Sequence, residues 1–432
     1  MPKSGQAGLL LGAIADDMTG ATDLANTLVR AGMRTVQLIG VPPPGMTPPD
    51  AAAIVIALKS RTAPVGDAVA WSTASLDWLR GVGARQTFFK YCPTFDSTDH
   101  GNIGPVADAL LKGLGSDFTI ACPAFPENGR SIYLGHLFVG DRLLSESSMR
   151  HHPLTPMMDS DLVRVLGRQT SGKVGLIPFA TVENGPSAIA KAMDALRGIG
   201  HRYAIIDALT NRHLLDIGEA ASRLALVTGG SGLALGLPAN FARAGGFELD
   251  ANSARLPPVA RAAAIISGSC SAATLRQVAH FRAEHPSFDI DPARLANGED
   301  VAGEALAWAK SQLATGPVLI SASAPPDQVA RIQRALGRDK AGVLVETALA
   351  DIAAGLVAAG VRRLVVAGGE TSGAVVQRLG VTALRIGPQI DPGVPWTLSL
   401  GEPEIALTLK SGNFGSDDFF SKSLRCLDQN SQ

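Results

Sequence analysis

The chain has 432 residues, of which 46% are hydrophobic and 18% charged, and its formal net charge at pH 7 is −1. Single hydrophobic cores stop growing at about 250–300 residues, so this length predicts two domains, and the hydrophobic content excludes extensive disorder. Because the 38 basic and 39 acidic residues form no basic run, we expect no nucleic-acid partner.

Several features of the sequence indicate a cytoplasmic protein. The apolar residues 9–15 are too few for a signal-peptide core and run directly into Asp16 and Asp17. No window approaches the roughly 18 apolar residues of a membrane helix, so we expect no membrane partner. The four cysteines lie far apart, as isolated reduced thiols do, which argues against structural zinc. The adjacent His151 and His152 point in different directions without further ligands nearby, so no metal site is expected there.

Short apolar runs alternate with helix-period segments along the first half of the chain. Residues 9–15 indicate a buried strand, and the segment after them places Ala21, Leu24, Ala25 and Leu28 on one helical face. Strands that alternate with helices predict parallel β-α-β units with helices on both faces of a sheet. Further strands are predicted at 36–39, 53–58, 88–91, 118–121 and 203–207.

Residues 247–261, with a Pro-Pro pair and mixed polarity, interrupt this rhythm. We therefore predict two α/β domains, residues 1–246 and 262–432, joined by a linker at 247–261. Each domain is expected to be a mainly parallel sheet flanked by helices, with the active site in the cleft between the domains. Strands of the second domain are predicted at 262–266, 318–321, 364–366 and 405–409.

Polar side chains follow the first strands of the predicted sheet, at the edge where open parallel sheets bind ligands. Asp16 and Asp17 follow the first strand, and such a pair can accept a hydroxyl proton or hold substrate hydroxyls. One Asp could instead cap the next helix. Arg61 follows the strand at 53–58, where a guanidinium suits a carboxylate or phosphate, although a solvated turn is the alternative.

A third strand end combines a lysine with a carboxylate and hydroxyls. Lys90 ends its strand, and Asp96 and Ser97 follow within the next loop. The group has the donors and acceptors of a polyol or sugar-acid cradle, or of a turn that leads into a helix. Three such strand ends in one domain favour a site for a polar small molecule.

Three glycine-rich loops follow strands of the second domain. They are residues 267–271, which include Ser267 and Ser269, residues 368–373, and residues 411–415 around Gly412. Small residues let backbone N–H groups approach an anion, and a helix N-terminus adds a positive dipole end. A single loop of this kind is more often a tight turn, but three at one sheet edge favour phosphate or nucleotide binding.

Two other glycine patterns do not qualify as nucleotide motifs. Residues 167–173 match the start of a Walker A loop, but Val174 stands where Ser or Thr must reach magnesium. Residues 229–232 lack the third glycine of a dinucleotide turn because Leu235 occupies its place. We interpret this second loop as a structural turn.

As a set, these segments resemble the four-carbon acid sugar kinase family over nearly the whole chain. The resemblance rests on four blocks, IADDMTGA at 14–21, PAFPENGR at 123–130, GGSG at 229–232 and GGETSG at 368–373. Three further segments resemble the branch that acts on 3-oxo-tetronate, because related threonate and erythronate kinases tend to carry Asp-Pro where this chain has His152-Pro153. Those segments are KYCPTFDST at 90–98, HHPLTPM at 151–157 and LKSGNFG at 409–415.

The resemblance implies a sugar-acid domain over residues 1–246 and an ATP domain over residues 262–432. It also implies that ATP, with Mg²⁺, phosphorylates the terminal hydroxyl of a small-molecule acid, 3-oxo-tetronate. A homodimer is expected only because dimers are the commonest oligomers. The implied ATP contacts are Ser267, Ser269, Gly368, Gly369, Glu370, Thr371 and Gly412. The implied acid-site residues are Asp16, Asp17, Arg61, Lys90, Asp96 and Ser97, with one of the first two as catalytic base.

Three alternatives stay open at this point. A threonate or erythronate 4-kinase of the same family needs the same two half-sites. An NAD-dependent sugar-acid dehydrogenase suits two α/β domains equally, although the G-x-G-x-x-G fingerprint is missing. A non-catalytic sugar-acid-binding protein would leave the three glycine loops without a purpose.

Overall fold

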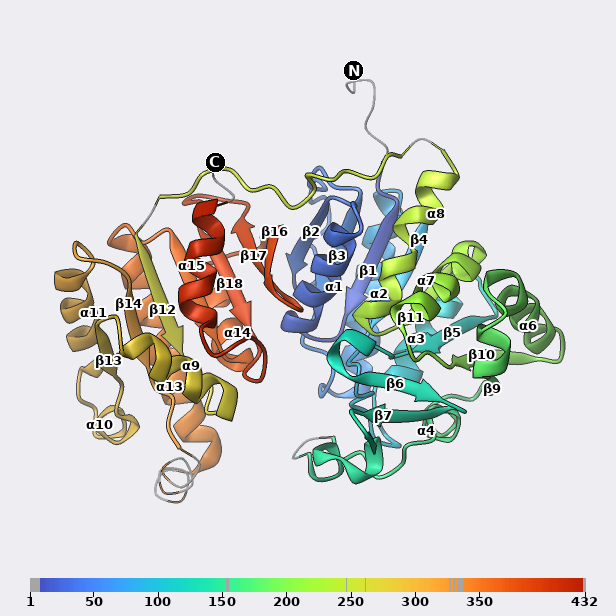
Figure 1. Cartoon of the computed structure of the whole chain (residues 1–432), viewed down its shortest axis with the longest axis horizontal. Helices are drawn as coiled ribbons and strands as arrows, with labels where there is room; N and C mark the ends of the chain where they lie inside the picture. The colour runs from blue at the N-terminus through green and yellow to red at the C-terminus, as the bar shows by residue number, and fades with distance from the viewer. Residues whose placement is uncertain are drawn as a thin grey trace. The chain divides into compact units, whose positions relative to one another are not determined.

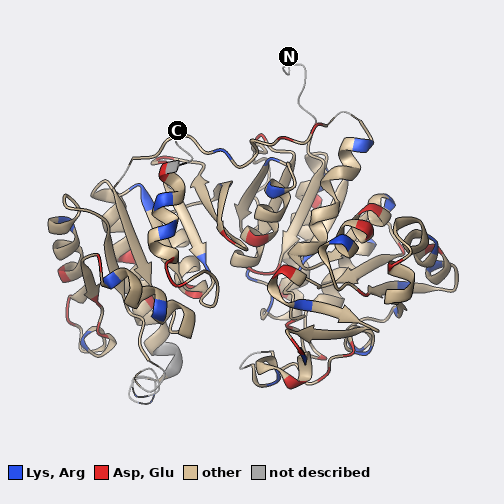
Figure 2. Ribbon diagram, viewed as in Figure 1, with Lys and Arg blue, Asp and Glu red and all other residues tan. Residues whose placement is uncertain are grey.

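A computed structural model describes residues 8–152, 155–245, 247–260, 262–325, 328, 331, 334 and 337–429. The chain divides into two compact units, Met1–Ser253 and Ala254–Gln432, which we call unit 1 and unit 2 (Figure 1). The division falls inside the residues that the sequence analysis assigned to a linker, whose limits remain a prediction. Acidic and basic residues are interspersed along the ribbon of each unit (Figure 2).

Unit 1 contains a parallel sheet with the strand order β2-β3-β1-β4-β11-β5-β10-β9. Apolar residues fill both faces of its central strands, and every residue of β1 and β3 is buried. Such continuous apolar runs are typical of parallel strands covered by helices on both sides. The strands are β1 (Leu11–Ala15), β2 (Thr35–Ile39), β3 (Ala53–Ala57), β4 (Gln86–Lys90), β5 (Thr119–Cys122), β9 (Lys173–Ile177), β10 (His201–Ile206) and β11 (Leu226–Gly229).

The helices of unit 1 follow the predicted alternation with the strands. The first of them, α1, is buried along almost its whole length because it packs against β2 and β3 and also against a 3-10 turn, η5 (Ser231–Gly236). The helices are α1 (Met18–Arg30), α2 (Val65–Gly81), α3 (Ile103–Gly113), α4 (Leu162–Gln169), α5 (Phe179–Val182), α6 (Pro186–Gly198), α7 (Asn211–Ala220) and α8 (Pro238–Arg243).

A small antiparallel sheet, which the sequence analysis did not predict, interrupts this alternation in unit 1. It has the order β6-β7-β8, with β6 (Arg130–Tyr133), β7 (His136–Val139) and β8 (Arg142–Leu143). Asp207, at the carboxyl end of β10, fixes its first turn because its carboxylate accepts the N–H groups of Leu134 and Gly135 at 2.7 and 2.9 Å.

Unit 2 contains a second sheet, with the order β13-β14-β12-β15-β18-β17-β16. Its first strands are parallel, and β17 and β16 extend it in antiparallel fashion. Each unit is therefore α/β with a mainly parallel sheet, as predicted. The strands are β12 (Ala263–Ser267), β13 (Ser287–Asp289), β14 (Val318–Ser321), β15 (Arg363–Ala367), β16 (Ala383–Asp391), β17 (Val394–Ser399) and β18 (Ala406–Lys410).

The helices of unit 2 enclose an aromatic-rich core. Trp396, Phe281 and Phe419 are fully buried there, and the indole N–H of Trp396 donates to the Ser423 carbonyl at 2.8 Å. The helices are α9 (Ala272–Arg282), α10 (Pro292–Ala296), α11 (Val301–Gln312), α13 (Arg338–Ala358), α14 (Gly369–Arg378) and α15 (Phe419–Gln429).

One helix corrects the expectation that no window is long and apolar enough to cross a membrane. By length and composition alone, Ala341–Ala358 of α13 passes that test. The helix packs against α11 and α14, and Leu349, Ile352, Ala353 and Leu356 along it are buried inside unit 2. These contacts place one face of the helix against the protein interior, while Val343 near its start is exposed.

Candidate active site

Unit 1 gathers its predicted polar residues at one edge of its sheet. In the parallel sheet β1 lies between β3 and β4, and Ala15 is in register with Ala57 and with Lys90. The carboxyl ends of these strands therefore meet. The backbone N–H groups of Ser60 and Arg61 donate to the Asp16 carbonyl at 3.0 and 3.2 Å, which fixes the loop after β3 against the end of β1.

Arg61 is the centre of a buried ion cluster. Its Nε and Nη2 donate to the two carboxylate oxygens of Asp16 at 2.9 and 2.8 Å, and Nη2 also donates to Asp17 Oδ1 at 2.7 Å. Its Nη1 lies 3.6 Å from Asp96 Oδ2. A planar guanidinium can serve several carboxylates at fixed angles, which an ammonium cannot do. The guanidinium thus holds the three carboxylates in a defined arrangement.

Lys90 enters this cluster from β4. Its side chain is 2% exposed, and its Nζ lies 3.5 Å from Asp17 Oδ1. A Cβ atom at Gly20 would lie 1.9 Å from that Nζ, so the first turn of α1 admits the lysine only because residue 20 is glycine. Burial disfavours the ammonium charge, but Asp17 and Asp16 outweigh this effect and raise the pKa of Lys90.

The two adjacent aspartates have different environments. Burial raises the pKa of Asp16, which Arg61 only partly opposes. Burial also disfavours the Asp17 charge, but Arg61 and Lys90 outweigh it and lower the pKa of Asp17. The side chain of Asp17 is 27% exposed and that of Asp16 only 7%. Asp17 is therefore the carboxylate that a ligand can reach, while Asp16 packs beneath it against Arg61.

Ser97 lies outside the ion cluster, although it follows Asp96 in the chain. Its hydroxyl accepts a hydrogen bond from Gln169 Nε2 at 2.9 Å, and its N–H donates to Met157 Sδ at 3.4 Å. It borders a separate cavity of about 330 Å³ that also contains Asp159 and Arg168. The structure thus brings together Asp16, Asp17, Arg61, Lys90 and Asp96, and directs Ser97 toward α4.

The three glycine-rich loops of unit 2 also meet at one sheet edge. In this sheet β15 lies between β12 and β18, and Ala367 is in register with Ser267 and Lys410. Backbone bonds join the loops, since the N–H of Gly368 donates to the Lys410 carbonyl at 2.8 Å. A Cβ atom at Gly412 would lie 2.4 Å from Ser269 Oγ, so a larger residue there would displace the Ser269 side chain where the two loops approach each other.

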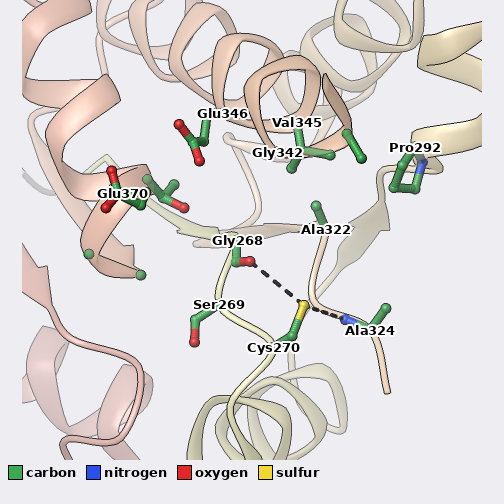
Figure 3. A pocket seen from close by; sticks show the side chains of 14 residues that line it. Gly268, Ser269, Cys270, Pro292, Ala322, Ala324, Gly342, Val345, Glu346 and Glu370 are labelled. Carbon is green, nitrogen blue, oxygen red and sulfur yellow. Dashed lines mark hydrogen bonds between the residues drawn. The ribbon is translucent and has the colours of Figure 1, made fainter. Parts of the chain in front are cut away.

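Two of these loops, residues 267–271 and 368–373, border a cavity of about 320 Å³ (Figure 3), whereas Gly412 and the rest of the 411–415 loop do not line it. Most of the predicted ATP-contact residues line it, whereas Ser267 lies beneath it, fully buried and 2.8 Å from Ser323 Oγ. Glu346 and Glu370 approach the cavity from two helices, α13 and α14. The predicted residues on its wall are Ser269, Gly368, Gly369, Glu370 and Thr371.

Lys410 is a functional candidate that the sequence analysis missed. Its side chain is fully buried beneath the Gly412 loop, and its ammonium donates to Thr274 Oγ1 at 3.1 Å and to the carbonyls of Ser411 and Gly412 at 3.0 Å each. Burial lowers the pKa of Lys410 to about 7. The signals in the sequence were its place in the family segment at 409–415 and its position at a strand end, directly before a glycine loop.

Comparison with known proteins identifies the family. A family model described as a sugar-binding N-terminal domain matches residues 11–237. A second family model, described as a nucleotide-binding C-terminal domain, matches residues 264–420. A Burkholderia multivorans protein named 3-oxo-tetronate kinase is 61% identical over 419 residues, 97% of each chain. A Cupriavidus necator protein of the same name is 59% identical over 421 residues, again 97% of each.

A solved structure agrees with these matches. The crystal structure of a Haemophilus influenzae protein is 43% identical to the chain and superposes with a TM-score of 0.82. The match covers 96% of this chain and 100% of that one. The resemblance noted in the sequence is thus confirmed, and the chain belongs to the four-carbon acid sugar kinase family, with a sugar-binding domain followed by a nucleotide-binding domain.

Proposed function

We propose that the protein is an ATP-dependent kinase that phosphorylates the terminal hydroxyl of 3-oxo-tetronate. The observation that carries this proposal is the presence of both half-sites, each at the carboxyl edge of its own parallel sheet. One unit matches a sugar-binding domain and the other a nucleotide-binding domain. The choice of acid is supported by relatives at 59% and 61% identity that bear the name 3-oxo-tetronate kinase.

In unit 1 the acid would bind against the Arg61-centred cluster. Asp17 is the more exposed aspartate, so we assign to it the role of base for the substrate hydroxyl that attacks phosphorus. It would take the hydroxyl proton and pass it to solvent, while the oxygen bonds to the γ-phosphorus of ATP and ADP leaves. Asp16 would act indirectly by holding Arg61 in place. Arg61 and Lys90 would stabilise the charge on the transferred group, which is a large part of catalysis in phosphoryl transfer.

In unit 2 the glycine loops would hold ATP. Small residues expose backbone N–H groups there, and helices α9 and α14 begin directly behind the loops with the positive ends of their dipoles. The hydroxyl of Ser271 caps α9 and donates to the Gly412 carbonyl at 2.6 Å, which fixes one loop to the next. Ser269, Thr371 and Gly412 are proposed phosphate contacts on this basis.

Mg²⁺ is a further part of the proposal. Bound to ATP, it would neutralise charge on the phosphate oxygens. Carboxylate oxygens are suitable ligands for it, and Glu346 and Glu370 both line the cavity. Within the described residues, no three His, Cys, Asp or Glu side chains gather as a metal-binding group. Phosphate oxygens and water would therefore supply most of the coordination.

The direct test is ADP release from ATP and Mg²⁺ with 3-oxo-tetronate, threonate and erythronate as parallel acceptors. We expect the highest kcat/KM with 3-oxo-tetronate. Turnover with threonate or erythronate alone would keep the kinase and change its substrate. No ADP release with any acceptor, combined with NADH formation from NAD and one of these acids, would instead indicate the dehydrogenase. Gel filtration with light scattering tests the expected homodimer.

A further inference from the structure

A carboxylate outside the predicted site is buried without a complete set of partners. Asp23, on α1, is 7% exposed, and within the described part of the chain its Oδ1 has no hydrogen-bond partner. Burial raises the pKa of Asp23 to about 6, which Lys90 and Ser231 only partly oppose. Buried polar atoms are nearly always hydrogen-bonded, so an unpartnered carboxylate oxygen points to a missing ligand.

The Lys90 ammonium lies close enough to Asp23 to lower the pKa of its carboxyl group. Gly20, on which its Nζ packs, and Asp23 are three positions apart and so share one face of α1. An ammonium has three donors, yet in the described residues Lys90 has one contact, to Asp17 at 3.5 Å, which is longer than an ordinary hydrogen bond. The lysine therefore has donors to spare beside a carboxylate with an acceptor to spare.

Ser231 supplies a third incomplete group. It begins η5, directly behind β11, whose Gly229 is in register with Lys90. Its side chain is fully buried, and its Oγ has no hydrogen-bond partner in the ranges that the structure describes. Because η5 packs against α1, the Ser231 hydroxyl lies close enough to the Asp23 carboxylate to lower its pKa as a long hydrogen-bond donor, although the two side chains make no hydrogen bond of ordinary geometry. The loop interpreted above as a structural turn thus borders the acid half-site.

We propose that Lys90, Asp23 and Ser231 form a seat for a second hydroxyl group of the acid. An alcohol oxygen can accept a hydrogen bond from the Lys90 ammonium while its proton is donated to the Asp23 carboxylate, and Ser231 completes the seat. The inference rests on the proposed function for the identity of the ligand. In 3-oxo-tetronate the hydroxyl on carbon 4 is the one phosphorylated, which leaves the hydroxyl on carbon 2 for this seat.

The first test measures KM for 3-oxo-tetronate and for ATP in Asp23→Asn and Ser231→Ala. A lost hydrogen bond to a charged group predicts a rise of about 10-fold or more in KM for the acid with Asp23→Asn, and about 3-fold with Ser231→Ala. KM for ATP should stay within about 2-fold. Ser72→Ala is the matched control, because Ser72 on α2 is also buried and, within the described residues, its hydroxyl has no hydrogen-bond partner, in the cluster or elsewhere.

A second test uses the analogue that lacks the hydroxyl on carbon 2. Wild type should lose about 10-fold in kcat/KM with this analogue, and Asp23→Asn should lose at most about 3-fold. Equal losses in both proteins would overturn the inference, because Asp23 would then not sense that hydroxyl. Unchanged KM for the acid in both variants would overturn it as well and leave the seat to a water molecule. If wild type itself turned over no acid, the proposed function would fail instead, which these assays distinguish. Ser231→Ala keeps the test valid if Asp23→Asn does not fold.

Discussion

Two lysines end central parallel strands in the two units, yet their surroundings are opposite. Lys90 ends β4 and Lys410 ends β18, and neither side chain is more than 2% exposed. Lys90 lies against Asp17, with further carboxylates close enough to help raise its pKa. Within the described chain, Lys410 contacts one hydroxyl and two backbone carbonyls but no carboxylate.

This difference indicates what each lysine does. The charge of Lys90 is balanced by protein carboxylates, so its site suits a ligand that offers hydroxyl groups. The charge of Lys410 has no protein counter-ion among the described residues, so an anion that binds nearby would stabilise its charged form. We infer that Lys410 supports the glycine loop that receives the phosphates of ATP. The following experiments test this contrast.

The largest effect is expected for Lys90→Met, which removes the ammonium but keeps the length of the side chain. Asp17 and Asp23 would lose their common cation, and breaking a buried charge pair costs roughly 3–5 kcal/mol. We expect kcat/KM for the acid to fall about 1000-fold while KM for ATP stays nearly constant. Lys191→Met, on the exposed side of α6, is the control. Turnover within about 10-fold of wild type would remove Lys90 from the acid site.

Substitutions of the two aspartates should have different effects on kcat and on thermal stability. Asp17→Asn should lower kcat by about 100-fold, because a positioned carboxylate contributes this much as a proton acceptor. Asp16→Asn should lower kcat less and thermal stability more, since Arg61 loses the carboxylate that holds both its Nε and Nη2. The opposite order of effects on kcat would assign the base to Asp16. Full turnover in both variants would remove the pair from the mechanism.

The lowered pKa of Lys410 predicts a dependence of stability on pH. Between pH about 7, its folded value, and 10.5, its ordinary value, the unfolded chain carries the proton and the folded chain does not. The contribution of Lys410 to the free energy of unfolding therefore rises with pH in this window, by at most about 1.4 kcal/mol per unit. Denaturant unfolding of wild type and Lys410→Met at pH 7 and 9 measures this contribution. The other titrating groups contribute equally to both proteins, so they cancel in the difference between them.

We expect wild type to gain roughly 2–3 kcal/mol relative to Lys410→Met between these two pH values. A difference that does not change with pH would mean that the lysine stays charged throughout. Its three hydrogen bonds would then compensate fully for the cost of burying its charge. Lys410 and Lys90 would differ only in the groups that they contact and not in their charge.

The cluster in unit 1 could be predicted because its members follow apolar strands directly. Once β1, β3 and β4 are parallel neighbours, Asp16, Arg61 and Lys90 must come to one edge. Asp23 could not be predicted in the same way. The helical pattern places Ala21 and Leu24 toward the sheet and leaves Asp23 for solvent, but η5 covers that side of α1 as well. No feature of the local sequence indicates this contact between α1 and η5.

The three strands of the small antiparallel sheet, which are among those not predicted, have a similar explanation. The strands β6, β7 and β8 are short and half-exposed, and in β6 Arg130 stands on the same face as the buried Ile132, where alternation would need an apolar residue. Their turn depends on Asp207, which is distant in sequence. Lys410 was visible only as part of a family segment, because its burial is set by Thr274 and the Gly412 loop rather than by its neighbours in the chain.

The smallest expected effect distinguishes the two lysines by the substrate whose KM changes. Lys410→Met removes the one donor that joins the carbonyls of Ser411 and Gly412, and the Gly412 carbonyl keeps only the hydroxyls of Ser271 and Thr274 as donors within the described residues. The loop at 411–415 should therefore loosen, and KM for ATP should rise about 5–10-fold, as expected for one or two lost hydrogen bonds. KM for the acid should not change, in contrast to Lys90→Met. Lys422→Met is the control, because Lys422 is a half-exposed lysine of unit 2 paired with Asp391. If Lys410→Met raised KM for the acid as much as that for ATP, its role would be general to the fold, and the assignment of the two lysines to two different ligands would fail.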